Sequence, residues 1–532
     1  MNTEQPRILA TLILISLSLG ACGGGGSGGG AGGGASGASG ASGGGGGGGA
    51  YTVGGTVTGL VGGGLTLSNN GGDYGDYLEV DANGAFTFKT EFGAGVAYSV
   101  TINIQPNSPV QTCTVNNGEG SVTGANITTV VVNCARFAFV ANSGSNSISA
   151  YLIDNTSGAF TAVAGSPFAT GANPSAVTFD PSGQFVYVPN AGSNNVSAYT
   201  INTTTGVLTA IAGSPFAAGA NPSAVTFDPS GQFVYVPNAG SNNVSAYTIN
   251  TTTGALTAIA GSPFAAGTNP SVVTFNYTNT GEFAYVANQN SNNVSAYSID
   301  ATTGALTAIA GSPFVAGANP SVITFNDFST GQFAYVANAG SNNVSAYTIN
   351  TTTGALTAIA GSPFAAGAKP SVITFNDFGT VEFAYVANQN SNDISAYSVD
   401  TATGALTAIA GSPFPAGANP SVITFDTGTR QFAYVANAGS NNVSAYTINT
   451  TTGALTAIAG SPFATGTGPG TLSIDSSGDF AYLANHGSGS VSAFTINATT
   501  GALIAVAGSP FATGANPYSV TLPIDSFNPW GY

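Results

Sequence analysis

Side chains that could carry out acid–base or metal chemistry are scarce in this sequence. The 532 residues include one histidine, five lysines and arginines, and 21 aspartates and glutamates, which gives a formal net charge of −16. Acid–base catalysis needs ionisable groups that converge on the reacting atoms. The sequence contains a repeat of four predicted strands, described below. A shared site would form from the loop between the second and third strands and the loop that enters the first strand. The ionisable residues in these two loop positions are His486 and Lys369, and neither position holds a carboxylate. We therefore predict no catalytic residue, metal or cofactor, and treat Lys369 and His486 as candidate binding residues.

A second candidate is a set of asparagines that end a recurring motif. The motif reads Phe-(Ala/Val)-(Tyr/Phe)-(Val/Leu)-(Ala/Pro)-Asn and recurs every 48 to 50 residues. An amide both donates and accepts hydrogen bonds, so a ring of amides would suit a glycan or an uncharged protein surface. The alternative is that each asparagine caps its own turn at the end of a strand. The eight residues are Asn142, Asn190, Asn238, Asn288, Asn338, Asn388, Asn437 and Asn485.

The motif lies within a repeat that predicts β-strands only. In one copy we expect strands over Pro222–Phe227, Phe233–Val236, Asn242–Asn250 and Ala255–Ala260, with turn residues between them and Gly261-Ser262-Pro263-Phe264 as a connection. Four-stranded repeats of this length are typical of β-propeller blades. Eight motifs and eight proline-started strands match only if the last of these strands, Pro517–Leu522, pairs with the first motif, at Phe137–Asn142. We therefore predict eight blades over residues 135–532, with the two ends of the ring sharing one blade.

Charged residues at the start of the second strands belong to the opposite end of such a propeller. Glu282 and Glu382 directly precede this strand, so we expect them near the mouth opposite His486. Arg136 and Arg430 occupy similar starts, where we expect them to be solvated. The acidic net charge argues against nucleic acid, because binding phosphates requires clustered lysine and arginine.

Residues 51–134 show a different pattern of short β runs. We expect strands over Tyr51–Val57, Gly64–Ser68, Tyr77–Val80, Ala85–Thr90, Ala97–Ile104 and Ile127–Val132, which together suggest a small β-sandwich. Cys113 and Cys134 are both in this segment. In an oxidising compartment they most simply form a disulfide, since two cysteines without a nearby histidine make a poor metal site.

The amino-terminal segment carries signals for export. Ile8 to Leu19 is an apolar run too short to span a bilayer as a helix. It ends in Leu19-Gly20-Ala21-Cys22, which resembles the lipobox of bacterial lipoproteins and implies a signal peptide over 1–21 and a lipidated Cys22. A plain signal peptide is the alternative. No aspartate follows Cys22, so the resemblance implies the outer membrane as the destination. Residues 22–50 are rich in glycine, which predicts a flexible tether.

The repeats also resemble those of the lactonase-type propellers, which include propeller 6-phosphogluconolactonases, and of surface-layer propellers with Tyr-Val-Thr-Asn repeats. Here the motif reads Tyr-Val-Ala-Asn in most copies, as at Tyr335–Asn338, and Tyr-Val-Pro-Asn at Tyr187–Asn190. The resemblance implies a propeller, usually of seven blades, and lactone hydrolysis by converging acid–base and cationic groups. None of the family's catalytic residues can be placed on this sequence, so an enzymatic role would rest on fold analogy.

Two functions follow as hypotheses. The first is a monomeric, lipid-anchored protein of the cell envelope, facing the surface or the periplasm, whose propeller binds a glycan or an envelope protein. The second is a lactonase-like hydrolase on the same fold. Near-identical blades favour the first, because catalysis normally needs one asymmetric site.

Overall fold

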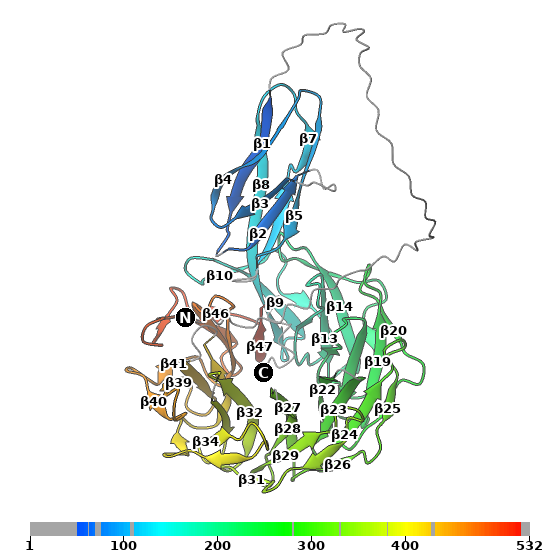
Figure 1. The fold of residues 1–532 in the computed structure, drawn as a ribbon, viewed down its shortest axis with the longest axis vertical. Helices are drawn as coiled ribbons and strands as arrows, with labels where there is room; N and C mark the ends of the chain where they lie inside the picture. The colour runs from blue at the N-terminus through cyan, green and yellow to red at the C-terminus, as the bar shows by residue number, and fades with distance from the viewer. Residues whose placement is uncertain are drawn as a thin grey trace, which may run out of the picture. The chain divides into compact units, whose positions relative to one another are not determined.

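Strands make up all the regular structure in the part of the chain that the structure describes. The computed structural model describes residues 50–61, 63–69, 76–106, 111–278, 281–328, 331–379, 381–426 and 431–522, and every element in these ranges is a β-strand (Figure 1). Within these ranges there is no helix of a length and apolarity that could cross a membrane. The predicted signal peptide, Cys22, the tether and Arg430 lie outside the described residues.

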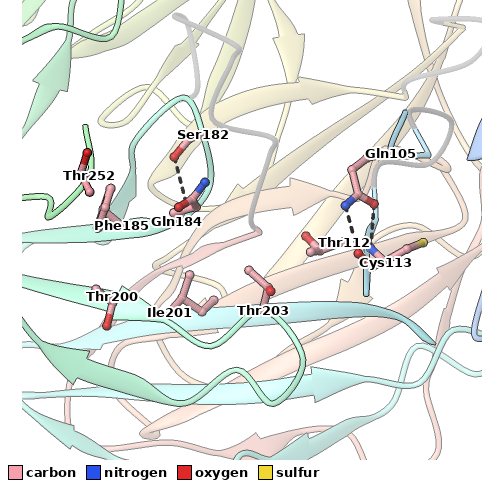
Figure 2. Close-up of a pocket in the computed structure, with 10 residues that line it drawn as sticks. All are labelled: Gln105, Thr112, Cys113, Ser182, Gln184, Phe185, Thr200, Ile201, Thr203 and Thr252. Atoms are coloured by element: carbon pink, nitrogen blue, oxygen red, sulfur yellow. Dashed lines mark hydrogen bonds between the residues drawn. The ribbon is translucent and has the colours of Figure 1, made fainter. Parts of the chain in front are cut away.

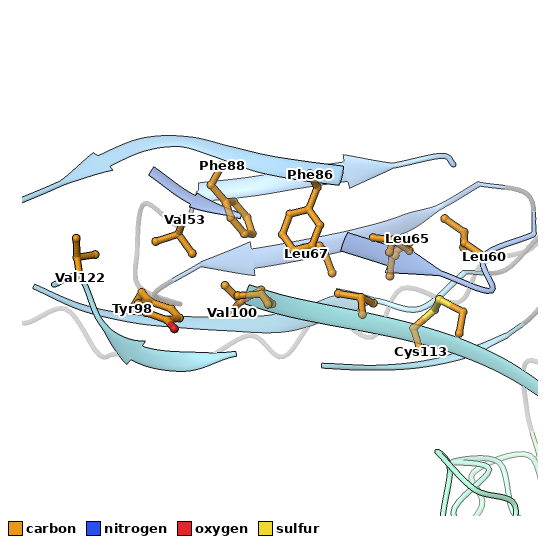
Figure 3. Packing of buried hydrophobic residues seen from close by; sticks show 14 residues of the cluster. Val53, Leu60, Leu65, Leu67, Phe86, Phe88, Tyr98, Val100, Cys113 and Val122 are labelled. Atoms are coloured by element: carbon orange, nitrogen blue, oxygen red, sulfur yellow. A yellow bond between two sulfur atoms is a disulfide. The ribbon is translucent and has the colours of Figure 1, made fainter. Parts of the chain in front are cut away.

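The small domain is a β-sandwich. One sheet has the order β4–β1–β8–β6 and the other β3–β2–β5–β7, with β1 and β8 parallel. Val53, Leu67 and Phe88 lie in the buried core (Figure 3). The strands are β1 (Tyr51–Thr58), β2 (Leu65–Asn69), β3 (Asp76–Val80), β4 (Gly84–Phe92), β5 (Ala97–Ile104), β6 (Thr112–Asn116), β7 (Glu119–Ser121) and β8 (Ile127–Asn142). The predicted strands are present, and β6 and β7 were not predicted.

A disulfide joins β6 to β8 in this domain. Cys113 and Cys134 are directly paired across the two strands, with Cα atoms 3.9 Å apart and the sulfurs bonded. The predicted pairing is confirmed. Gln105 holds the same edge, because its side-chain amide binds both the N–H and the carbonyl of Cys113.

Strand β8 continues without a break from the sandwich into the propeller. Its first part pairs with β1 and β6, and its last part, from Arg136 to Asn142, pairs with β9 (Ser147–Ile153). The boundary expected between residues 134 and 135 thus lies inside a strand.

The propeller contains eight blades among the described residues; blades 2 to 8 have their strands in sequence order, whereas in blade 1 the last strand of the chain pairs with β8. Figure 1 shows these sheets arranged around a common centre. Blade 1 contains β8 and β9, and blades 2 to 8 follow along the chain. The second strands are, after β8, β13 (Phe185–Asn190), β18 (Phe233–Asn238), β23 (Gly281–Asn288), β28 (Gly331–Asn338), β33 (Glu382–Asn388), β38 (Phe432–Asn437) and β43 (Phe480–Asn485). The third strands are, after β9, β14 (Asn195–Ile201), β19 (Asn243–Ile249), β24 (Asn293–Ile299), β29 (Asn343–Ile349), β34 (Asp393–Val399), β39 (Asn442–Ile448) and β44 (Ser490–Ile496).

The innermost strands start at the prolines. In blade 3 the expected Pro222–Phe227 is interrupted: Pro222 bridges Asn238 alone, and pairing resumes at Thr226. Later blades show a register shift at the same place, so a bulge follows the proline. The inner strands are β12 (Thr178–Phe179), β17 (Thr226–Phe227), β22 (Pro270–Thr278), β27 (Pro320–Phe328), β32 (Pro370–Asp377), β37 (Pro420–Phe425), β42 (Pro469–Ile474) and β47 (Pro517–Thr521).

The outer strand of each blade is split in two, which corrects the predicted Ala255–Ala260 strand. In blade 3, Leu256–Ala258 and Phe264–Ala265 both pair with β19, so the expected connection carries strand residues. Between them the Ser262 hydroxyl accepts the Ala246 N–H at 2.9 Å, in place of a ladder carbonyl. The first segments are β10 (Phe160–Ala162), β15 (Leu208–Ala210), β20 (Leu256–Ala258), β25 (Leu306–Ala308), β30 (Leu356–Ala358), β35 (Leu406–Ala408), β40 (Leu455–Ala457) and β45 (Leu503–Ala505). The second segments are β11 (Phe168–Ala169), β16 (Phe216–Ala217), β21 (Phe264–Ala265), β26 (Phe314–Val315), β31 (Phe364–Ala365), β36 (Phe414–Pro415), β41 (Phe463–Ala464) and β46 (Phe511–Ala512).

Adjacent blades pack through both faces of the second strand. Tyr187 of blade 2 is buried against Val234 and Val236 of blade 3, and its hydroxyl donates to the Gly254 carbonyl of blade 3 at 2.6 Å. Gly254 has φ +71°, and a Cβ there would lie 2.4 Å from the Phe185 ring, so the turn requires glycine. The apolar motif therefore acts as the core between blades.

The predicted end-to-end closure is confirmed. Strand β47 pairs with β8 in the register Pro517↔Asn142 and Val520↔Val140. The Tyr482 hydroxyl of blade 8 donates to the Gly158 carbonyl of blade 1 at 3.2 Å, which repeats the contact seen between other neighbours. The ring is thus closed by the two ends of its own chain.

Candidate functional site

One end of the propeller, which we call mouth A, is formed by the loops between the second and third strands and by those entering the inner strands. In each blade the residue after the motif asparagine donates its N–H to the carbonyl of the residue before the inner-strand proline. His486 and Gly468 are such a pair at 2.9 Å, and Gln389 and Lys369 are another at 2.9 Å. The opposite end, mouth B, is formed by the turns joining first to second and third to fourth strands.

The eight motif asparagines contribute to the fold and are not accessible from mouth A. All are 0% exposed. Each donates from Nδ2 to a serine hydroxyl on the third strand, as Asn238 does to Ser245 at 2.9 Å. The expectation of a binding ring is therefore corrected in favour of strand-end capping, because a ligand cannot contact side chains without exposed surface. The remaining donors are Asn142, Asn190, Asn288, Asn338, Asn388, Asn437 and Asn485.

Lys369 lies at mouth A in a backbone conformation that disfavours lysine. Its φ is +56°, while seven equivalent positions hold asparagine or glycine, as at Asn319 and Gly468. The Asn342 side chain fixes this conformation by accepting the Lys369 N–H at 2.9 Å. The Lys369 side chain itself is exposed. A lysine kept where its backbone is strained marks a position that is worth testing for function.

His486 is exposed on blade 8, two blades from Lys369 on blade 6, so the structure does not bring them together. A carboxylate that the sequence comparison missed lies on blade 6. Asp393 starts β34, where five other blades have asparagine, and accepts Asn388 Nδ2 at 2.7 Å and the Ser391 hydroxyl at 3.0 Å. Aligning the starts of the third strands would have revealed it.

The inner strands link neighbouring blades around the axis at mouth A. In blades 2 to 7 the serine after the inner proline donates to the main-chain carbonyl of the equivalent residue in the next blade, as Ser175 does to Ser223 at 2.8 Å. Five further links of this kind start from Ser223, Ser271, Ser321, Ser371 and Ser421. Blades 8 and 1 have Gly470 and Tyr518 at this position instead.

Mouth B holds the buried charges. Arg136, 7% exposed, forms an ion pair with Asp475 of blade 8, donates to Asn155 Oδ1 at 2.8 Å and packs over the Phe480 ring. The expectation that Arg136 is solvated is wrong, because its partner comes from the other end of the ring.

The two glutamates lie at mouth B as predicted, at or next to the starts of β23 and β33. Burial raises the pKa of Glu282, and the neighbouring Asp228 raises it further. Burial also raises the pKa of Glu382 to about 7, against the effect of a hydrogen bond from Asn326. Both carboxyls sit between blades, which makes them elements of blade packing.

A cavity of about 400 Å³ is lined by residues of the small domain and of blades 2 and 3 (Figure 2). Neutral side chains line it, among them Gln105, Gln184 and Thr203. The Gln105 amide is already bound to Cys113. No cluster of three histidine, cysteine, aspartate or glutamate side chains suited to a metal ion occurs among the described residues.

The fold and these contacts define an all-β propeller of eight blades with an almost uncharged mouth A. A family model described as "Lactonase, 7-bladed beta-propeller" matches residues 94–219, 209–325, 327–425 and 414–516. The chain belongs to this family. It departs from the family's description in having eight blades.

Three solved structures are similar to this chain. A putative 6-phosphogluconolactonase from Bacteroides fragilis is 18% identical, with 73% of this chain and 98% of that chain covered and a TM-score of 0.48. The periplasmic gluconolactonase of Pseudomonas aeruginosa is 16% identical, with 73% and 99% covered and a TM-score of 0.49. A dihydro-heme d1 dehydrogenase is 14% identical, with 72% and 74% covered and a TM-score of 0.51. Identities this low show the fold alone. A search of the curated proteins found no match.

Proposed function

We propose that this protein is a lipid-anchored component of the cell envelope, in the outer membrane, whose propeller binds a glycan or an envelope protein at mouth A. The observation that carries the proposal is the chemistry of mouth A. Its described loops present asparagine, glutamine, serine and alanine, with Lys369, Asp393 and His486 as the ionisable side chains. His486 lies two blades from Lys369 and Asp393, and the Asp393 carboxylate is bound to Asn388 and Ser391. Neutral amides and hydroxyls, which predominate here, suit an uncharged ligand.

Lactone hydrolysis is the second candidate, because the chain belongs to the lactonase family and His486 is exposed at mouth A. Hydrolysis requires water activation and stabilisation of an oxyanion, both close to the same carbonyl carbon. The chain offers a single imidazole, that of His486, and the hydrogen bond to the Gly468 carbonyl comes from the main-chain N–H of this residue.

The two functions are separated by measuring turnover and binding on the same protein. We expect the purified full chain to leave glucono-1,5-lactone and 6-phosphogluconolactone at their spontaneous rates of hydrolysis. His486→Ala should not change these rates. Turnover above background that His486→Ala removes would overturn the binding proposal in favour of the hydrolase.

The anchor is tested separately. Cys22→Ser should move the protein from the membrane to the soluble fraction after cell lysis, because it removes the acylated thiol. Retention of the variant in membranes would contradict lipidation. Metabolic labelling with a clickable fatty acid provides a second readout, which should be lost in the same variant.

A further inference from the structure

The serine links of the inner ring at mouth A are interrupted at one place, where blades 8 and 1 meet. In blades 2 to 7 the serine after the inner proline forms the link to the next blade, and the last of these links, from Ser421 to Gly470 O, is 3.4 Å long. From blade 7 onward links also form three residues deeper along the strand: Thr424 donates to Leu472 O at 3.0 Å and Ser473 to Val520 O at 2.8 Å. Thr521 likewise donates to Val177 O at 3.0 Å. On blades 8 and 1, Gly470 and Tyr518 occupy the position of the linking serine.

The residues at this interruption differ from their equivalents in a consistent way. Gly470 and Gly468 replace serine and asparagine, so two side chains are missing on blade 8. Tyr518 replaces serine on blade 1 and is 58% exposed. His486, also exposed, occupies a position that holds alanine, glutamine or serine in the other blades, on the loop bonded to Gly468. We call Gly468, Gly470, His486 and Tyr518 the Tyr518 notch.

The parts of the notch are held next to one another by the ring closure. A Cβ on Gly470 would lie 2.9 Å from the Tyr518 carbonyl oxygen, so the two inner strands touch here. Pro517 pairs with Asn142, which places Tyr518 at the mouth A end of β47. The result is an exposed aromatic ring beside two glycines of blade 8, with an imidazole on the adjoining loop.

We propose that the Tyr518 notch is a binding subsite for a neutral saccharide, with the apolar face of one sugar ring stacked on the Tyr518 ring. This inference rests on the proposed binding function and assigns it a ligand class and a place. An aromatic ring supplies apolar contact at low entropic cost, and its hydroxyl remains available to a polar ligand. The neighbouring rim supplies neutral donors and acceptors, including Asn173, Asn516 and Ser143, which suit hydroxyl groups.

Charge and area favour this class over others. The notch contains no lysine or arginine, so an acidic sugar would find no fixed cation there. A docked protein would need about 800 Å² of complementary surface on each partner, far more than a single exposed ring provides. A neutral oligosaccharide needs only a small platform and a polar rim.

The test is calorimetric titration of the full chain with hexasaccharides of glucose (β-1,4 and α-1,4), mannose, xylose and N-acetylglucosamine, and with hexagalacturonate as the acidic probe. Tyr518→Ser installs the residue that six other blades carry, and Tyr518→Phe keeps the ring. Tyr77→Ser is the matched control, because Tyr77 is 57% exposed but lies in the small domain. We expect a neutral hexasaccharide to bind, and Tyr518→Ser to weaken it by about tenfold or more. Tyr518→Phe and Tyr77→Ser should change the affinity by less than about twofold.

Three results would overturn the inference. They are unchanged affinity in Tyr518→Ser, equal losses in Tyr518→Ser and Tyr518→Phe, and tighter binding of hexagalacturonate than of every neutral probe. Absence of binding to any hexasaccharide would also overturn it, while leaving the proposed function open to an envelope protein as ligand. The proposed function itself fails on a different readout, the lactone turnover that depends on His486.

Discussion

The ion pair that closes the ring allows a quantitative prediction about stability. Asp475 caps its own turn by accepting the Phe480 N–H at 3.1 Å and the Ser477 hydroxyl at 2.8 Å, as well as pairing with Arg136. Asp180 and Asp228 are buried in the same way and make the equivalent turn contacts. Neither faces an arginine, because the position of Arg136 is taken in the next blade by Gln232 and Glu282, respectively. A carboxylate at this position is thus stable without an arginine.

Arg136 has no comparable alternative. Its side chain is 6% exposed, and one terminal nitrogen, Nη2, has no hydrogen-bond partner even in the intact pair. Asp475→Asn should therefore destabilise the protein by about 3–5 kcal/mol, because it leaves a buried guanidinium unpaired. Arg136→Gln installs the residue of four other blades and loses the Asn155 contact and the stacking on Phe480, which should cost about 1–2 kcal/mol.

The assay is urea denaturation of the two single variants and of the double variant, monitored by circular dichroism. An unchanged slope of the unfolding free energy against urea concentration is the check on cooperativity. The double variant should be close to Arg136→Gln alone, because the unpaired charge is then gone and the pair resembles Asn276 and Gln332 of blades 4 and 5. If Arg136→Gln proves as destabilising as Asp475→Asn, the reasoning from the equivalent blades is refuted.

Three further predictions concern single sites. Lys369→Asn should stabilise the protein by about 0.5–1 kcal/mol, measured as a rise in denaturation midpoint, because asparagine tolerates positive φ; Lys89→Asn is the control. For Glu382, whose pKa rises from 4.5 in the unfolded chain to about 7 in the fold, the folded state binds the extra proton, so stability falls as pH increases from 4.5 to 7. Glu382→Gln should accordingly raise the melting temperature at pH 8 and leave it nearly unchanged at pH 4.5; an equal rise at both would contradict burial as the cause. Replacing Cys113 and Cys134 with serine should destabilise the small domain by about 3 kcal/mol, because the disulfide closes a loop with a sequence separation of 21 residues. The measurement is limited proteolysis of residues 51–134 in the full chain. Unchanged resistance to the protease would argue against a stabilising role.

Much of the fold follows from the period of the sequence. Equal numbers of Phe motifs and proline-started strands allow only one closed arrangement, so eight blades and the pairing of Pro517 with Asn142 could be predicted. The split of the outer strand could not, because it depends on the Ser262 hydroxyl replacing a ladder carbonyl. Strands β6 and β7 are short, and their apolar and polar residues do not alternate clearly, so the sequence pattern did not predict them.

The site was harder to predict than the fold. A repeated asparagine has the same spacing whether it faces a ligand or its own third strand, and only the contact to Ser245 decides between them. Arg136 needed a partner 339 residues away in sequence, which no local pattern reveals. Asp393 and Tyr518 lie outside the two loop positions that line mouth A in the sequence pattern: Asp393 starts a third strand, and Tyr518 belongs to the strand that closes the ring.

The continuous strand β8 has a mechanical consequence. A pull on the chain at residue 50 reaches the propeller through β1, which is parallel to β8, and then through β8 itself. Because β1 is pulled at its amino-terminal end and β8 leaves at its carboxyl end, the hydrogen bonds between them are loaded in shear, all at once. In blade 1 the same strand lies between β9 and β47, so force is shared by the first and last strands of the ring. A propeller held in this way resists extension as one body, and tension would not peel its blades off in order.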